Sequence, residues 1–219
     1  MSENAKWFSL ARKTAKGGLL LLSGDLYARF VMFVAMIVIA RLLGPSDYGL
    51  YVLSFVIPYL FVPLCNLGLN HALLYFPGKL RSREHEEEVP VFVGTGLIIR
   101  TSTAFLAFLI CYSAADFLAT QVLGRGELAP FLRLISPVIL FQSLFAIFYH
   151  SFTGLGEPRK SAFLRILYAS LKALFATSLV LLGFGIGGAL FGFVLASFLV
   201  SLVGFFFLVA KFGRRAFFF

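Results

Sequence analysis

Six long apolar runs, separated by short polar connections, make up most of the chain. About 20 helical residues cross the ~30 Å hydrocarbon core of a bilayer, and each run reaches that length. The pattern therefore predicts an all-α integral membrane protein whose residues 17–210 form one bundle of six transmembrane helices. The predicted spans are approximately residues 17–40, 49–76, 89–115, 130–153, 161–184 and 187–210.

The composition favours a membrane protein over a soluble one. Of the 219 residues, 60% are hydrophobic and only 13% are charged, whereas soluble domains average about 25% charged residues. The net charge is +9, but most Lys and Arg residues lie in the short connections. That placement is typical of membrane topology and not of a nucleic-acid surface. We therefore expect the lipid bilayer as a partner and no nucleic acid.

The basic residues also predict the orientation in the membrane. With the N-terminus in the cytoplasm, the inner segments hold twelve Lys and Arg residues and the outer ends hold three. Cytoplasmic segments carry such an excess, so both termini are expected on the cytoplasmic side of the cell (plasma or inner) membrane. Residues 1–16 mix basic residues with Trp7 and Phe8, and they form either an amphipathic helix on this surface or a basic tail. Residues 211–219 form a second basic and aromatic end.

Three cationic residues lie near the middle of alternate predicted spans. Arg29, Arg100 and Lys172 are 11 or 12 residues from the cytoplasmic start of their runs, which is roughly 16–18 Å into the membrane. A charge at this depth usually marks a functional site. We expect the three to share one central cavity that binds an anion such as phosphate or pyrophosphate. The alternative is local pairing that only packs the bundle. Arg165, closer to the inner end, is expected to reach the membrane surface.

Asp25 is the only acidic residue inside a predicted span. It lies four residues before Arg29, on the same face of a helix. It is expected either to orient that arginine or to bind a coupling proton or cation. A neighbouring arginine keeps a carboxylate ionised, which favours the orienting role.

The second predicted span contains two prolines and two asparagines. Pro58 and Pro63 predict a bend, which serves either as a hinge during transport or as a fixed kink packed against its neighbours. Asn66, Asn70 and, in the fourth span, Gln142 are expected either to contact a sugar or to bond between helices.

The sequence offers no catalytic constellation, so we predict no enzyme activity, no metal and no cofactor. It lacks a nucleophile elbow, a phosphate-binding loop and a pair of carboxylates at one membrane surface. Residues 84–88 read Glu-His-Glu-Glu-Glu, which is expected to start a helix, since carboxylates favour the positive helix end. Cys65 and Cys111 fall in apolar runs and are expected to be small core residues.

Three short segments resemble a known family. Residues 40–51 read Ala-Arg-Leu-Leu-Gly-Pro-Ser-Asp-Tyr-Gly-Leu-Tyr, residues 66–69 read Asn-Leu-Gly-Leu, and residues 154–159 read Gly-Leu-Gly-Glu-Pro-Arg. These segments resemble the polysaccharide or O-antigen flippase branch of the multidrug/oligosaccharidyl-lipid/polysaccharide (MOP) exporter superfamily, in its N-terminal lobe.

The resemblance implies two six-helix lobes that move around a central cationic cavity. It implies transport of a polyprenyl-(pyro)phosphate-linked glycan from the inner to the outer leaflet, with the sugar in the cavity and the prenyl tail in lipid. Arg29 falls where a related precursor-lipid flippase has a cavity arginine, while the position near Ala35 lacks the second arginine of that relative.

The sequence ends after the sixth run. We therefore expect a fragment, a truncated product or a half-transporter that pairs with a second six-helix lobe. The rival functions are a cation-coupled multidrug exporter of the same superfamily, a membrane scaffold that transports nothing, and a membrane transferase. Buried acids would favour a site for cationic drugs, and here basic residues outnumber the single acid.

Overall fold

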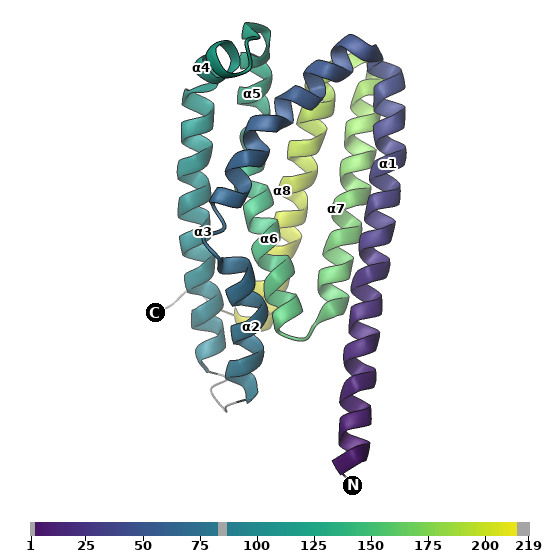
Figure 1. The fold of residues 1–219 in the computed structure, drawn as a ribbon, viewed down its shortest axis with the longest axis vertical. Helices are drawn as coiled ribbons and strands as arrows, with labels where there is room; N and C mark the ends of the chain where they lie inside the picture. Colours follow the sequence, from purple (N-terminus) through teal and green to yellow (C-terminus); the bar gives the residue numbers. More distant parts are fainter. Residues whose placement is uncertain (1–2, 83–86, 214–219) are drawn as a thin grey trace.

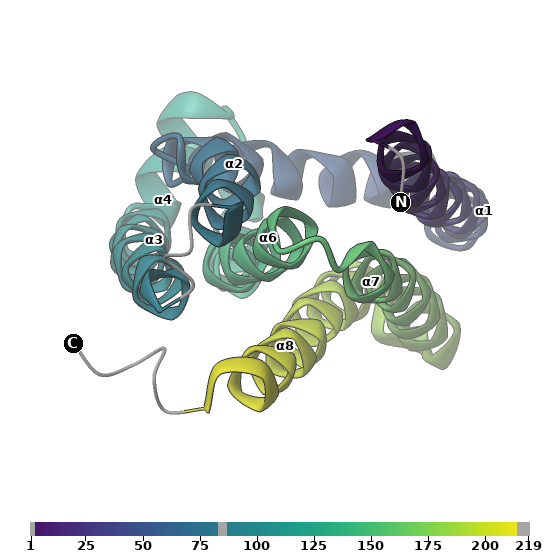
Figure 2. The same ribbon diagram turned by 90° about the horizontal axis from the view of Figure 1, so that it is seen from below.

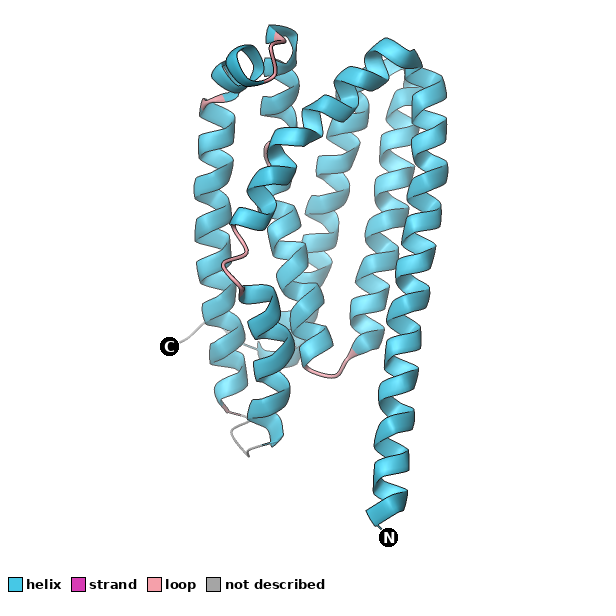
Figure 3. Ribbon diagram, in the orientation of Figure 1, coloured by secondary structure: helices cyan, strands magenta, loops and turns pink. Residues whose placement is uncertain are grey.

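The computed structural model describes residues 3–82 and 87–213, and nearly all of them are helical (Figures 1 and 3). This described part contains no strand. Residues 83–86, which hold most of the predicted acidic helix start, and residues 214–219 of the predicted C-terminal segment lie outside it. The predicted N-terminal segment is helical from Glu3 onward, and most of its side chains also lie outside the described part.

The first two predicted spans form one helix, α1 (Glu3–Leu64), which is sharply bent at Gly44. Gly44 has φ 76° and ψ 172°, a backbone conformation that glycine adopts without steric cost. Pro45 follows, with φ fixed near the helical value. The predicted connection at residues 41–48 is therefore helical except at one residue. The bend produces two arms, a first arm before Gly44 and a second arm after it (Figure 1).

The second predicted span is interrupted in its lower half. α1 ends at Leu64, residues 65–68 form turns, and the helix resumes as α2 (Leu69–Ser82). Leu67 and Gly68 have positive φ angles of 46° and 79°, which end a right-handed helix. The interruption thus follows Pro63 directly, whereas Pro58 lies inside continuous helix.

The remaining long helices run alternately up and down the bundle (Figure 1). α3 (Glu88–Ser113) begins with an acidic residue and leads to three short elements, α4 (Ala115–Phe117), η1 (Leu118–Val122) and η2 (Gly126–Leu128). They are followed by α5 (Ala129–Ile135), α6 (Val138–Gly154) and α7 (Pro158–Leu179). The turn η3 (Val180–Phe184) leads into α8 (Gly185–Phe212). Positive φ angles at Gly183 and Gly185 reverse the chain between the last two long helices.

α7 lies between the first arm of α1 and α8, and α6 lies between α3 and α8 (Figure 2). Small residues allow these helices to approach closely, as is common in membranes. A Cβ atom on Gly192 of α8 would lie 2.7 Å from the backbone nitrogen of Ala176 on α7. A Cβ on Gly24 would lie 3.4 Å from the Cβ of Ala162.

Four stretches of the described chain are long and apolar enough to cross a membrane. They are Ala15–Leu64, Glu88–Ser113, Gly126–Gly154 and Pro158–Phe212. Large side chains on their outer faces, such as Leu19, Phe30 and Phe33, are more than half exposed. Exposed apolar surface of this extent suits contact with lipid and not with water. The chain is therefore an all-α, multi-pass membrane protein.

Ion pairs join the end of α8 to the turn between α6 and α7. Glu157, the residue before α7, forms an ion pair with Lys160, whose Nζ is 2.8 Å from Oε2, and accepts a hydrogen bond at Oε1 from Lys211 near the end of α8. Burial of Glu157 raises the pKa of its carboxyl, but the hydrogen bonds and charges of the two lysines outweigh burial and hold that pKa below its ordinary value of 4.5.

Candidate functional site

A cavity of about 260 Å³ lies between the two arms of α1, α6 and α7. We call it the charged compartment, because three cationic side chains contribute to its wall. Its polar and aromatic lining comes from Arg29, Tyr59, Gln142, Arg165, Tyr168 and Lys172.

The helical repeat places these side chains together. Arg165, Tyr168 and Lys172 are spaced at i, i+3 and i+7, so they occupy one face of α7. Arg29 lies on the first arm of α1, which packs along α7. Tyr59 comes from the second arm, so the bend at Gly44 brings it to the same cavity.

Asp25 pairs with Arg165 and not with Arg29. The Oδ1 atom of Asp25 accepts a hydrogen bond from Nε of Arg165 at 2.9 Å, and both side chains are a little over one-third exposed. The prediction that Asp25 pairs with Arg29 on the same helix is therefore wrong, because α7 places Arg165 next to the carboxylate of Asp25. This pairing also corrects the expectation that Arg165 only reaches toward the membrane surface.

The other two cations of the cavity have no carboxylate of their own. Within the described residues, neither Arg29 nor Lys172 has an acidic group within 4.0 Å. Nζ of Lys172 instead lies 3.5 Å from the ring centroid of Phe193 and 5.2 Å from that of Tyr168. Aromatic faces attract an ammonium group but supply no negative counter-charge.

Arg100 lies outside this cavity. The prediction that Arg29, Arg100 and Lys172 share one central cavity is therefore wrong for Arg100. Its side chain is only 1% exposed, and its Nη1 donates to Oδ1 of Asn66 at 2.7 Å and to Oδ1 of Asn70 at 3.5 Å. α3, which carries Arg100, packs on α2 and α6. The sequence predicted the same membrane depth for Arg100 as for Arg29 and Lys172, but depth does not decide which face of a helix carries a residue. Arg100 lies on a face of α3 that does not reach the cavity.

The two asparagines support this buried arginine at the interruption of the second span. Oδ1 of Asn66 also accepts the backbone N–H of Asn70 at 3.0 Å, which satisfies a donor in the first turn of α2. Asn66 and Asn70 thus bond between and within helices, the second of the two roles predicted for them. Gln142 lines the charged compartment. The hinge role of Pro58 and Pro63 stays a prediction.

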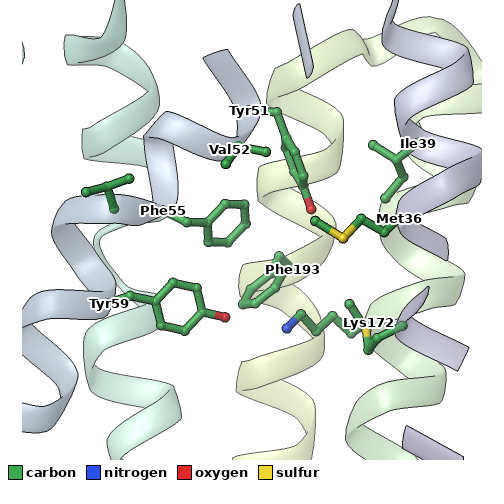
Figure 4. A pocket seen from close by; sticks show the side chains of 10 residues that line it. Met36, Ile39, Tyr51, Val52, Phe55, Tyr59, Lys172 and Phe193 are labelled. Carbon is green, nitrogen blue, oxygen red and sulfur yellow. The ribbon is translucent and has the colours of Figure 1, made fainter. Parts of the chain in front are cut away.

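A second cavity of about 360 Å³ adjoins the first (Figure 4). We call it the aromatic compartment, because Tyr51, Phe55, Tyr59 and Phe193 line it together with Met32 and Met36. Met32, Tyr59 and Lys172 line both compartments. This cavity was not predicted from the sequence, because its lining comes from four segments, namely the two arms of α1, α7 and α8.

Comparison with known proteins agrees with this architecture. The sequence model of the family described as "Polysaccharide biosynthesis protein" matches residues 14–219. The succinoglycan biosynthesis transport protein ExoT of Rhizobium meliloti is 30% identical over 154 residues, covering 70% of this chain and 29% of its own length. The stage V sporulation protein B of Bacillus subtilis is 25% identical over 193 residues, covering 86% and 37%. The chain thus spans about a third of the length of these relatives.

Solved structures show the same fold. An outward-facing multidrug resistance MATE family transporter of the MOP superfamily superimposes with a TM-score of 0.70 at 21% identity, covering 86% of this chain and 44% of that one. A MATE transporter in a bent conformation gives a TM-score of 0.75 at 21% identity, covering 93% and 47%. The family resemblance predicted from the short segments is confirmed, and this chain belongs to the polysaccharide biosynthesis protein family.

Proposed function

We propose that this chain is one lobe of a flippase that moves a lipid-linked oligosaccharide or polysaccharide precursor from the inner to the outer leaflet of the cell membrane. One observation carries the proposal. Arg29 and Lys172 line the same intramembrane cavity, and neither has a carboxylate partner among the described residues. Cations kept unpaired inside a membrane are costly, so they indicate an anionic ligand. The phosphate of a lipid carrier is such a ligand.

The charge of the cavity argues against a cargo of cationic drugs. Among the described residues, the carboxylate that pairs with a cation of this cavity is that of Asp25, and it is already bonded to Arg165. An organic cation entering the charged compartment would meet Arg29 and Lys172, and no acidic residue is among the described residues that line the compartment.

The membrane topology that we propose has six crossings with both ends in the cytoplasm. The stretches Ala15–Leu64 and Pro158–Phe212 have 50 and 55 residues, which is about 75 and 83 Å of straight helix and more than twice the bilayer core. Each reverses at glycines with positive φ, the first at Gly44 and the other at Gly183 and Gly185. Each stretch therefore supplies two crossings. A second six-helix lobe, present in another segment or another chain, would complete the cavity.

The experiment measures binding of a polyprenyl-pyrophosphate-linked oligosaccharide to the purified chain in lipid nanodiscs. The variants Arg29→Gln and Lys172→Gln should each weaken binding about tenfold, because each removes one charge-assisted contact. Arg133→Gln is the matched control, since Arg133 pairs with Asp116 at the other end of the bundle and does not line the cavity. Unchanged binding in both cavity variants would favour a scaffold, and preferential binding of an organic cation would favour a drug exporter.

A further inference from the structure

The two compartments differ sharply in chemistry although they share a wall. The charged compartment contains two arginines, a lysine and a glutamine. In the aromatic compartment, polar side-chain atoms come only from Tyr51, Tyr59 and Lys172 among the ten residues that line it. In Figure 4 the hydroxyl of Tyr59 and the ammonium of Lys172 point toward each other across Phe193, and the apolar walls extend away from them. The pair of cavities is therefore polar at one end and apolar at the other.

We infer that the aromatic compartment holds the first isoprene units of the lipid carrier while its phosphate lies against Arg29 and Lys172. The inference rests on the proposed function and deepens it, because it assigns the two ends of the cargo to two subsites. It also revises the expectation that the prenyl tail stays entirely in lipid.

The composition of the wall selects an isoprenoid over a sugar ring. A sugar carries a hydroxyl on most of its carbons, and each hydroxyl would lose its water without gaining a partner against Met32, Met36 and Phe55. An isoprene chain has no polar atom to leave unsatisfied. Its branched outline suits methionine side chains, which adapt to irregular apolar surfaces.

The aromatic compartment also has an exit for the rest of a long chain. Met36 on the first arm of α1 and Val52 and Val56 on the second arm line it, and their side chains are 50%, 39% and 41% exposed. The cavity is thus open between the two arms. A carrier whose first units fill the compartment can leave through this side.

The first experiment compares binding of isopentenyl, geranyl and farnesyl phosphate to the 219-residue chain in nanodiscs. The variant Met36→Trp fills the aromatic compartment, and Val34→Trp is its control, since Val34 is exposed on the same arm but lines neither compartment. The ligands partition into the lipid of the nanodisc equally with either variant, so this contribution cancels when the two variants are compared. We expect a gain of about tenfold from isopentenyl to geranyl phosphate in the control. Met36→Trp should lose this gain, because the indole fills the space that the additional isoprene unit would occupy. The same chain-length dependence in both variants would overturn the inference.

The second experiment uses the unaltered chain, so its result does not depend on how a tryptophan variant folds. Geranyl phosphate with a photoreactive group on its terminal isoprene should label Met36, Val52 or Phe193, and unlabelled geranyl phosphate should compete. Labelling confined to lipid-facing residues such as Phe30 and Phe33 would contradict the subsite. If Arg29→Gln and Lys172→Gln leave isopentenyl phosphate binding unchanged, the proposed function itself fails. If these two variants weaken binding but binding does not depend on tail length, only the proposed tail subsite is contradicted.

Discussion

The arginine and lysine side chains in the membrane differ in what surrounds them. The guanidinium of Arg165 pairs with a carboxylate, and the ammonium of Lys172 lies against aromatic rings. The guanidinium of Arg100 donates to two amide oxygens. Their depth along each run was readable from the sequence, since it depends only on the rise per residue. Their partners were not, because a partner depends on which face of which helix lies opposite. The spacing of Arg165 and Lys172, seven residues apart on one helix face, was the signal that could have identified Arg165 as a cavity residue.

Asp25→Asn tests the charge balance of the cavity at the scale of one residue. The substitution leaves Arg165 without its carboxylate and so adds one uncompensated positive charge near Arg29 and Lys172. We expect affinity for pyrophosphate to rise about two- to fivefold, a modest gain because the ion pair is partly exposed and screened. Isothermal titration calorimetry on the two proteins measures it. Weaker binding in the variant would mean that Asp25 positions Arg165 for the ligand.

At the scale of elements, the apolar runs located the helices well but not their interruptions. Gly44 was recognisable as a turn residue, and the structure bends α1 there. The two prolines predicted a bend in the second span, yet the chain leaves the helix at residues 65–68, after Pro63. A helix carries a proline when neighbouring helices satisfy the freed backbone groups. The interruption also contains Asn66, which accepts a hydrogen bond from Arg100 of α3, a contact that the local sequence does not reveal.

Arg100→Gln should loosen this interruption without affecting the phosphate site. The variant removes charge-assisted hydrogen bonds to Asn66 and Asn70 from a fully buried position. We expect the free energy of unfolding to fall by about 1.5–3 kcal/mol, measured by thermal or denaturant unfolding in detergent. Binding of isopentenyl phosphate should stay within about twofold of the original, since Arg100 does not line the charged compartment. A large loss of binding with unchanged stability would place Arg100 in the site after all.

Glu157 predicts an acid-dependent loss of stability at the junction of α6, α7 and α8. Its pKa is lowered in the folded chain, so the ionised carboxylate stabilises the fold above its pKa in the unfolded chain. This stabilisation is lost as the pH falls below about 4.5 and through the folded-state pKa. Glu157→Gln should lower stability at pH 7 and flatten the dependence of stability on pH below about 4.5, measured as Tm against pH.

Glu127→Gln is the matched control for that experiment, because the pair between Glu127 and Arg125 is exposed on both sides. Exposed ion pairs contribute little to stability. An equal pH dependence of the Glu157 and Glu127 variants would show that the junction pairs are not stabilising.

At the scale of the molecule, the chain covers between 44% and 48% of the MATE transporters whose fold it shares. The class of the fold was predictable from length and hydropathy alone, because few architectures satisfy every backbone group in lipid. The arrangement around the cavity was not predictable, since it depends on the bend of α1 and on the packing of α7 between α1 and α8.

The proposed topology is testable with single cysteines. The native Cys65 and Cys111 are buried, with 3% and 0% exposure, and are expected to react slowly. Ser46→Cys, at the bend of α1, should react with a membrane-impermeant maleimide added outside intact cells. Arg159→Cys, in the turn before α7, should react only after permeabilisation. The opposite pattern would reverse the orientation, and labelling of both from outside would contradict an odd number of crossings between them.

The most direct test of the central claim is a cryo-electron microscopy structure of the chain with a polyprenyl pyrophosphate bound. The account predicts diphosphate density within about 4 Å of the guanidinium of Arg29 and the ammonium of Lys172, with the first isoprene units against Phe55 and Phe193. Diphosphate density beside Arg100, or only at the lysines around Glu157, would contradict it.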